Sequence, residues 1–270
     1  MRAIVMRSFG GPDVLRLEEF PPPQAGPGEV VFQVHAVSVN RTLDLVVRAG
    51  DYPFEIKLPH ILGSDPSGVI TAIGPGVTDR KVGDRVVSIP WRTQPVGPLD
   101  SLGMQHLGGY AEYTKLPAAS TVLVPDGLDF ATATVVTRHA PAAFNLLRDR
   151  AQVQSGEWVL VMGAAGGLGS AGVQVAKHLG AKVIAAAGAP ERVQAALDLG
   201  TDYGVDYRAQ DLTEEVLRIT EGRGVEVVFE NIADPVLFPK AFMSIARHGR
   251  LVTAGSHGGG DVNLNVKRLY

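Results

Sequence analysis

Cysteine is absent from the sequence, which excludes disulfide bonds and zinc sites with thiolate ligands. A strong charge of either sign is also missing, since 25 Lys and Arg residues stand against 28 Asp and Glu residues. This balance gives no reason to expect a nucleic acid or an anionic membrane surface as a partner. No apolar run is as long as a membrane span, and the first residues do not form a signal peptide, so we expect a cytoplasmic protein.

The composition fits a soluble globular enzyme, with 45% hydrophobic and 20% charged residues in a chain of 270. A chain of this length holds one large or two modest domains. Over residues 1–124, short apolar strands alternate with turns rich in glycine and proline. The strands that we expect there are residues 3–6, 30–37, 68–73, 85–89 and 110–115. This pattern predicts an antiparallel, barrel-like domain over residues 1–124.

Helices begin to alternate with strands from about residue 125. The expected strands are residues 158–162, 182–187, 203–207, 225–231 and 250–255. Pro190 lies in the first turn of one expected helix, whereas Asp234 and Pro235 open another that Gly249 terminates. Pro239 falls inside this last helix and should bend it or delay its start. The alternation predicts an α/β domain over residues 125–270 with a doubly wound parallel sheet.

A glycine-rich segment at residues 163–169 (GAAGGLG) joins the strand at 158–162 to a helix that we expect at 170–179. Gly163 allows a tight turn, Gly166 and Gly167 let backbone N–H groups approach a pyrophosphate, and Gly169 lets the helix pack closely on the sheet. The start of the helix offers unpaired N–H groups and a positive dipole end to the phosphates. The segment therefore predicts a dinucleotide-binding turn, and the alternative is an ordinary strand–turn–helix. The other members of the turn that we assign to cofactor binding are Ala164, Ala165 and Leu168.

Several motifs occur in order along the chain, namely Asn40 followed by Asp44, then residues 48–53 (RAGDYP), 59–68 (PHILGSDPSG), 82–86 (VGDRV), 108–113 (GGYAEY) and 163–169. Together they resemble the medium-chain dehydrogenase/reductase superfamily and, within it, the zinc-free quinone oxidoreductase-like branch. The resemblance implies a GroES-like β-barrel domain that binds substrate, a Rossmann domain and hydride transfer from NAD(P)H. Members of the family continue beyond the position of Tyr270 to supply a sixth strand, so the resemblance also implies a truncated chain.

Zinc-dependent members of the family carry metal ligands at positions that this chain fills differently. Asn40 or Arg41 replaces a cysteine, Ser64 and Asp65 replace a His-Glu pair, and a third ligand would fall near Thr137. The cysteine-rich loop that binds structural zinc in these relatives would lie within residues 90–108 and is missing as well. The resemblance therefore implies no metal, which disfavours alcohol dehydrogenase chemistry because that reaction needs a Lewis acid.

The end of the second expected Rossmann strand indicates which nicotinamide cofactor is bound. Ala187 and Gly188 stand where NAD enzymes carry a carboxylate for the ribose hydroxyls, so nothing there repels a 2′-phosphate. The resemblance places Arg192 and Tyr207 around that phosphate, although Arg192 also fits a solvated surface charge. These residues favour NADPH over NADH. The other residues that we expect at the cofactor, from strand ends or from the resemblance, are Thr137, Asn231, Ala254 and Gly255.

Hydride transfer without a metal requires an electron-poor acceptor, such as a quinone, an α,β-unsaturated ketone or an enoyl thioester. The protein must stabilise the oxyanion that develops and supply a proton from a tyrosine or from water. Tyr52 resembles the catalytic tyrosine of enoyl-thioester reductases, and the alternative is a tyrosine that packs on the domain rim. Asn40 is a candidate for binding the acceptor oxygen or the nicotinamide ribose, and the alternative is a turn residue. Asp44 and Arg48 lie four positions apart on an expected helix, so we expect them to pair.

Three functions stay open. The first is an NADPH-dependent, zinc-independent oxidoreductase that acts on a small quinone or enone. The second is an enoyl-thioester reductase with a basic entrance for a CoA or phosphopantetheine tail, for which Arg41, Arg48 and Arg92 are the candidates. The third is a non-catalytic NADPH-binding protein. A homodimer is a further expectation from the resemblance, because the last strand often pairs across a dimer in the family.

Overall fold

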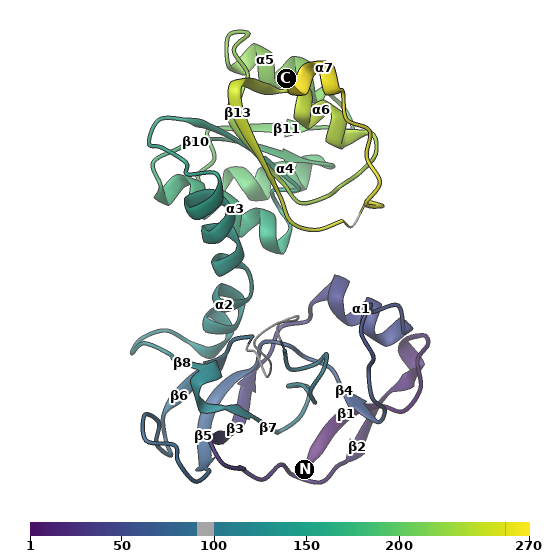
Figure 1. Ribbon diagram of the computed structural model, residues 1–270, viewed down its shortest axis with the longest axis vertical. Helices are drawn as coiled ribbons and strands as arrows, with labels where there is room; N and C mark the ends of the chain where they lie inside the picture. Colours follow the sequence, from purple (N-terminus) through teal and green to yellow (C-terminus); the bar gives the residue numbers. More distant parts are fainter. Residues whose placement is uncertain (91–99, 257) are drawn as a thin grey trace. The chain divides into compact units, whose positions relative to one another are not determined.

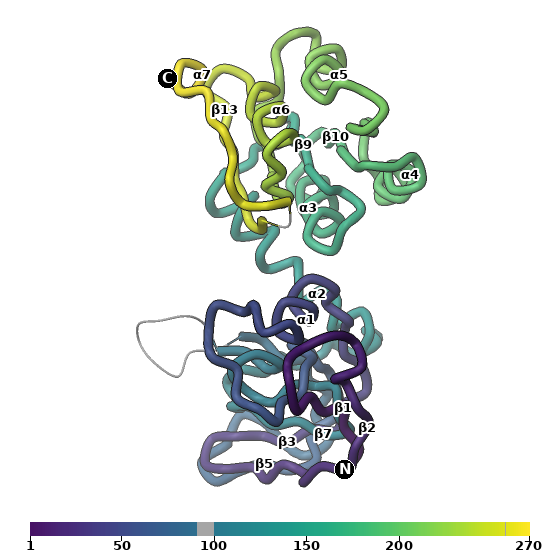
Figure 2. The backbone as a smooth tube through the Cα atoms, turned by 90° about the vertical axis from the view of Figure 1, so that its right-hand side faces the viewer, coloured from purple at the N-terminus to yellow at the C-terminus, as the bar shows by residue number. Residues whose placement is uncertain are grey.

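The computed structural model describes residues 1–90, 100–256 and 258–270 (Figures 1 and 2). The chain forms two compact units, Met1–Arg138 and His139–Tyr270, each with its own hydrophobic core. Helix α2, Phe130–Phe144, contains the division between the units. Within the described residues, no helix has both the length and the apolar composition that crossing a bilayer requires.

Antiparallel strands form the first unit. One sheet has the strand order β7-β3-β5-β6-β8, and a smaller one has the order β2-β1-β4. The bounds are β1 Arg2–Met6, β2 Leu15–Glu19, β3 Glu29–Ala36, β4 His60–Ile61, β5 Ser67–Ile73, β6 Arg85–Ser88, β7 Tyr113–Pro117 and β8 Thr121–Leu123. The prediction of an antiparallel domain is confirmed, although the strand expected at 110–115 begins only at Tyr113.

In the described part of the first unit, short helices accompany these sheets, namely η1 Pro12–Val14, α1 Arg41–Ala49 and η2 Ala118–Ser120. Helix α1 buries Val47 against a cluster that includes Met6, Ile56 and Leu62. Gly50 ends the helix in the left-handed conformation, with φ of 86°, which glycine adopts without steric cost. The packing of Val47 fixes the position of α1, and with it that of Asn40, the residue before the helix.

A parallel sheet with the strand order β11-β10-β9-β12-β13 forms the centre of the second unit, and β13 is the yellow edge strand in Figures 1 and 2. The bounds are β9 Trp158–Met162, β10 Lys182–Ala187, β11 Tyr203–Asp206, β12 Val225–Glu230 and β13 Ile245–Thr253. The predicted strands at 158–162 and 182–187 are confirmed at both ends. The strand order reverses between β9 and β12, and such a switch point is where open α/β sheets bind their ligands.

Helices cover both faces of this parallel sheet. They are η3 Asn145–Arg150, α3 Gly167–His178, α4 Pro190–Leu197, α5 Leu212–Ile219 and α6 Leu237–Met243, whereas the short α7 Val266–Leu269 after β13 is exposed. One core combines Val161 of β9 with Val173 of α3, whereas the other combines Leu160 of β9 with Val216 of α5. Because successive strand residues point to opposite faces, β9 is buried on both sides, as the doubly wound prediction requires.

Helix α6 is shorter than the sequence predicts. It begins at Leu237 rather than at Asp234, and it ends at Met243. Pro239 falls in its first turn, where backbone N–H groups have no acceptor within the helix, so the missing N–H of proline leaves no helical bond unmade. The predicted delay at Pro239 is therefore confirmed.

Strand β13 includes the residues that the sequence assigned to the end of that helix. The prediction that Gly249 terminates α6 is wrong, because Gly249 is an interior residue of β13. The pairing with β12 shifts register between Val225 and Val227, opposite Ile245 and Arg250. This irregularity takes up the additional residues around Gly249, and no local sequence pattern reveals it because it depends on pairing with a distant strand.

Candidate functional site

The turn between β9 and α3 shows why glycine stands at two of its positions. Gly163 has φ of 61°, and a Cβ there would lie 2.9 Å from the Asn231 Oδ1. A Cβ on Gly169 would lie 2.1 Å from the Gly163 carbonyl oxygen. The first glycine therefore permits the left-handed turn, and the second permits the close approach of α3. Ala164 is buried, and its N–H donates to the Ala186 carbonyl oxygen at 3.1 Å, which holds the turn against the sheet.

Helix α3 begins at Gly167 rather than at residue 170. Gly166 precedes it in extended conformation, and neither a capping side chain nor an acidic residue stands in its first turn. The first N–H groups and the positive dipole end are therefore left for an anion. Gly166 and Gly167 are exposed and Ala165 is half-buried, whereas Leu168 packs against the core beneath the turn.

Tyr207 stands at the carboxyl ends of β10 and β11. Its N–H donates to the Ala187 carbonyl oxygen at 3.0 Å, and its hydroxyl oxygen lies 2.8 Å from the place that a Cβ on Gly188 would take. Burial raises the pKa of Tyr207, while the charges of Arg208 and Arg192 oppose that shift. Two arginines therefore flank one tyrosine at this edge, and Arg192 is exposed there on α4.

A carboxylate near the same edge was missed in the sequence. Asp206 ends β11 and lies opposite Ala187 in the register of β10 with β11. Its Oδ1 accepts the Arg208 N–H at 3.0 Å, and its charge contributes to the raised pKa of Tyr207 after burial, the main cause. Only the strand pairing brings Asp206 to this edge, because it lies far from Ala187 along the chain.

Asn231, Ala254 and Gly255 come together at the carboxyl ends of β12 and β13. Asn231 is buried and donates from Nδ2 to the Met162 carbonyl oxygen at the end of β9, at 2.7 Å. The Ala254 N–H donates to the Glu230 carbonyl oxygen at 3.1 Å, and Gly255 has φ of 110°. The structure thus brings three of the predicted residues to the edge of the sheet from which the glycine-rich turn departs.

Asn40 caps the N-terminus of α1. Its Oδ1 accepts the Leu43 N–H at 3.1 Å, and the Asp44 Oδ2 accepts the Asn40 N–H at 2.9 Å, so the two residues cap the helix reciprocally. The predicted pair of Asp44 with Arg48 is wrong. Asp44 is buried and accepts the Tyr110 hydroxyl at 2.6 Å, whereas Arg48 donates to a backbone carbonyl of another segment.

Tyr52 and Thr137 both have side chains engaged within the first unit. Tyr52 is half-buried against the cluster that contains Val47, and its ring meets that of Phe54 edge-on, with 5.7 Å between centroids. The Thr137 hydroxyl donates to the Ala133 carbonyl oxygen of its own helix at 2.7 Å. These contacts fit the packing alternative for Tyr52, and its role as a proton donor stays a prediction.

Asp44 of α1 is buried near a second buried carboxylate, Asp65, whose charge acts on it. Asp65 accepts the backbone N–H and the hydroxyl of Ser38, and Asp44 accepts the Tyr110 hydroxyl. Burial raises the pKa of both carboxyls, and these hydrogen bonds oppose the shifts. Burial, followed by the bond to Asp44, raises the pKa of Tyr110 far above its ordinary value, so this phenol stays a donor. In the described part of the chain, no three His, Asp or Glu side chains gather as ligands for a metal ion.

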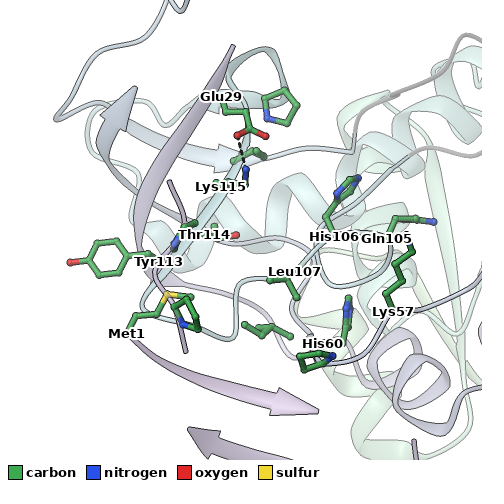
Figure 3. A pocket seen from close by; sticks show the side chains of 17 residues that line it. Met1, Glu29, Lys57, His60, Gln105, His106, Leu107, Tyr113, Thr114 and Lys115 are labelled. Carbon is green, nitrogen blue, oxygen red and sulfur yellow. Dashed lines mark hydrogen bonds and ion pairs between the residues drawn. The ribbon is translucent and has the colours of Figure 1, made fainter. Parts of the chain in front are cut away.

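The first unit also contains a cavity of about 460 Å³, drawn in Figure 3. The carboxylate of Glu29 and the ammonium of Lys115 form an ion pair at 2.8 Å beside it, and the buried His60 is among its lining residues. None of the predicted site residues lines this cavity. Arg92, a candidate for a basic entrance, lies outside the described residues.

Comparison with known proteins gives matches over nearly the whole chain. Residues 26–126 match the alcohol dehydrogenase GroES-like domain, and residues 167–270 match the zinc-binding dehydrogenase family. A quinone oxidoreductase of Pseudomonas aeruginosa is 32% identical over 98% of this chain and 76% of its own length. A phthioceranic/hydroxyphthioceranic acid synthase of Mycobacterium tuberculosis is 34% identical over 97% of this chain, but the chain spans only 12% of that protein.

The structure of Escherichia coli quinone oxidoreductase complexed with NADPH is similar to this chain with a TM-score of 0.85 at 29% identity. The match covers 100% of this chain and 77% of that one. The predicted fold class, a GroES-like domain followed by a Rossmann-like parallel sheet, is confirmed by these matches and by the two units described above. The chain therefore belongs to the medium-chain dehydrogenase/reductase superfamily, in its quinone oxidoreductase-like branch.

Proposed function

We propose that the chain is an NADPH-dependent, zinc-independent oxidoreductase that transfers hydride to a quinone or an α,β-unsaturated carbonyl compound. One observation carries this proposal: the uncapped N-terminus of α3 follows a turn that has no space for a side chain at Gly163 or at Gly169. Such a turn accepts a pyrophosphate through backbone N–H groups. The substrate domain is proposed to comprise residues 1–124 and the coenzyme domain residues 125–270.

The residues at the sheet edge fit the coenzyme. The backbone of residues 163–169 binds the pyrophosphate, while Asn231, Ala254 and Gly255 line the adjacent strand ends. Arg192 and Tyr207 bind the 2′-phosphate beside Gly188, and the nearby Arg208 adds a second positive charge. Thr137 is proposed to lie near the nicotinamide. When bound, NADPH supplies the hydride, and the protein orients it towards the acceptor.

On the substrate side, Asn40 is the better supported candidate. Its Oδ1 is used by the helix cap, but the cap does not use its Nδ2, which is a donor suited to an oxyanion that develops on the acceptor. The cap also fixes the side chain in one orientation, so that little freedom is lost when it binds. Tyr52 is proposed as the alternative proton donor, and its packing against Phe54 argues for a supporting role.

The test is NADPH and NADH oxidation by the purified chain with EDTA present throughout. The acceptors are 1,4-benzoquinone, 9,10-phenanthrenequinone, an aliphatic enone and crotonyl-CoA. Turnover with NADPH that survives EDTA supports the proposal, whereas turnover that EDTA abolishes contradicts zinc independence. NADPH binding without turnover on any acceptor would favour the third candidate function, a non-catalytic NADPH-binding protein. Sedimentation of the same preparation tests the predicted homodimer.

An enoyl-thioester reductase is the second candidate function. The match to a segment of a mycobacterial acid synthase favours this function, because the synthesis of an acid can include the reduction of an enoyl thioester. Preference for crotonyl-CoA over both quinones, by at least an order of magnitude in kcat/KM, would select this reading. Preference for a quinone would exclude it.

A further inference from the structure

Glu230 is a carboxylate with no exposed surface at the carboxyl end of β12, where residues 227–229 before it are apolar. A buried carboxylate is strongly unfavourable unless hydrogen bonds hold its charge. The Ile232 N–H donates to its Oε1 at 2.9 Å, and the Thr253 hydroxyl donates to its Oε2 at 3.2 Å. The Ala233 N–H donates to both oxygens, at 3.0 and 3.1 Å. The loop after β12 and strand β13 therefore both supply hydrogen-bond donors to the Glu230 carboxylate.

These bonds shape the loop that follows β12. The carboxylate folds back onto the N–H groups of its own loop, and Ala233 takes a φ of 53°, which residues other than glycine rarely adopt. A conformation of this kind persists only where the surroundings fix it. The hydrogen bonds from the Ala233 N–H to both oxygens of Glu230 fix this conformation.

The same residue ties this loop to the end of β13. Thr253 lies opposite Glu230 in the strand register, and the Glu230 carbonyl oxygen accepts the Ala254 N–H at 3.1 Å. Further along, Gly258 donates to the Ile232 carbonyl oxygen at 2.7 Å and Gly260 to that of Ala233 at 3.3 Å. Glu230 thus contacts the end of β13 through both its main chain and its side chain, and the same side chain accepts the N–H groups of Ile232 and Ala233.

We propose that Glu230 is a positioning residue that holds Asn231, Ala254 and Gly255 at the sheet edge and thereby sets the affinity for the dinucleotide. Asn231 follows Glu230 directly and donates to Met162, the last residue of β9, from which the glycine-rich turn departs. A shift of the loop at Glu230 therefore moves the Asn231 side chain, which contacts the residue before the glycine-rich turn. The inference rests on the proposed binding of NADPH, although the loop contacts themselves do not.

The test compares Glu230→Gln with Glu226→Gln on the same strand. In the first variant an amide nitrogen takes the place of one carboxylate oxygen, so the Ala233 N–H keeps a single acceptor and the negative charge that strengthens the bonds from the loop is removed. We expect the Kd for NADPH, measured by fluorescence titration, to rise about tenfold. Where turnover is measurable, the KM for NADPH should rise with kcat changed by less than about twofold. In the coenzyme-free protein, amide hydrogen exchange over residues 231–234 and 254–256 should accelerate about tenfold, with other segments unchanged.

Glu226 is the matched control because it also accepts a backbone N–H, that of Trp158 at 2.7 Å, but at the opposite end of β12. Its amide variant keeps one acceptor oxygen and should change neither the Kd nor the exchange of the two segments. An unchanged Kd and unchanged exchange in Glu230→Gln would overturn the proposal. So would an equal effect in the control, or acceleration spread over the whole unit.

Thr253→Val decides the question if Glu230→Gln does not fold. It removes one hydroxyl without changing the shape of the side chain, so the Kd should rise about twofold and exchange should accelerate in the same two segments. An unchanged exchange rate in this variant would contradict the proposed role. A wild-type chain that binds no NADPH would refute the proposed function, and exchange in the coenzyme-free protein would still show whether Glu230 holds the two segments.

Discussion

Two helices of the second unit begin in opposite ways. At α5, Asp211 precedes the helix and its Oδ1 accepts the N–H groups of Thr213 and Glu214, at 3.0 and 3.1 Å. Acidic residues also stand in the first turn of α5, whereas α3 follows Gly166 with neither a capping side chain nor an acidic residue. The positive end of α5 is thus satisfied by its own chain, and that of α3 is left for a ligand. The difference distinguishes a helix start that its own chain satisfies from the helix start that we propose as the site for the coenzyme phosphates.

The largest expected effect comes from closing the approach of α3 to its turn. In Gly169→Ala the added Cβ would lie 2.1 Å from the Gly163 carbonyl oxygen, so α3 must move away from the turn. A displacement of this kind should weaken NADPH binding about 100-fold, as measured by fluorescence titration. Gly166→Ala is the graded comparison, because its Cβ would lie 3.2 Å from the same oxygen and its effect should be much smaller. Equal Kd values for the two variants would contradict this account of Gly169.

Converting the start of α3 to that of α5 should separate stability from binding. Gly166 has extended backbone, which aspartate adopts without strain, so Gly166→Asp supplies the cap that Asp211 gives α5. We expect the free energy of unfolding of the coenzyme-free protein to rise by about 0.5 kcal/mol. The Kd for NADPH should rise about tenfold, because a carboxylate takes the N–H groups and repels phosphate.

Urea unfolding and fluorescence titration measure the two quantities on the same preparation. Gly166→Asn is the matched control, since it caps the helix without a charge and should weaken binding less than aspartate does. A variant that gains stability and binds NADPH as tightly as the wild type would show that the N-terminus of α3 does not bind the phosphates.

A smaller effect distinguishes the two coenzymes. Arg192 is exposed and acts on Tyr207 through its charge, so Arg192→Ala should raise the Kd for NADPH about fivefold, a loss of roughly 1 kcal/mol. The Kd for NADH, which lacks the 2′-phosphate, should stay within about twofold. Parallel loss of both coenzymes would contradict the assignment of Arg192 to the phosphate. Arg208→Ala shows whether the second arginine shares the role.

The open start of α3 was predicted from the sequence because it depends on neighbouring residues, whereas the cap of α5 by Asp211 was not among the predictions. The tight turn at Gly163, the close packing of the helix at Gly169 and the strand at 158–162 were predicted from the local sequence pattern. The structure shows all three. What else escaped prediction depends on segments far apart in the chain. Asp44 binds Tyr110 instead of Arg48, Gly249 lies in a strand that pairs irregularly with β12, and Glu230 is satisfied partly by Thr253. Periodicity reports how a segment folds locally, but it does not identify the partner of a buried charge.

The smallest expected effect on NADPH binding comes from changes at the start of α5, the helix that Asp211 caps. Asp211→Ala removes the cap of α5 and should lower the free energy of unfolding by about 1 kcal/mol at pH 7, with the Kd for NADPH unchanged. The bond from Lys240, followed by that from the Glu214 N–H, lowers the pKa of Asp211. A carboxyl with a lowered pKa contributes stability above its unfolded pKa and loses it as the pH falls through the folded value. The difference between wild type and variant should therefore shrink below about pH 4.

Urea unfolding at pH 7 and pH 3 measures this difference. Asp211→Asn keeps the cap and loses the ion pair with Lys240, so it should retain most of the stability at pH 7 and show little dependence on pH. Weaker NADPH binding in either variant would contradict the contrast, because it would mean that a helix start satisfied by its own chain also serves the ligand. Unchanged binding in both, together with the loss in Gly166→Asp, would assign the ligand to the start of α3 rather than to that of α5.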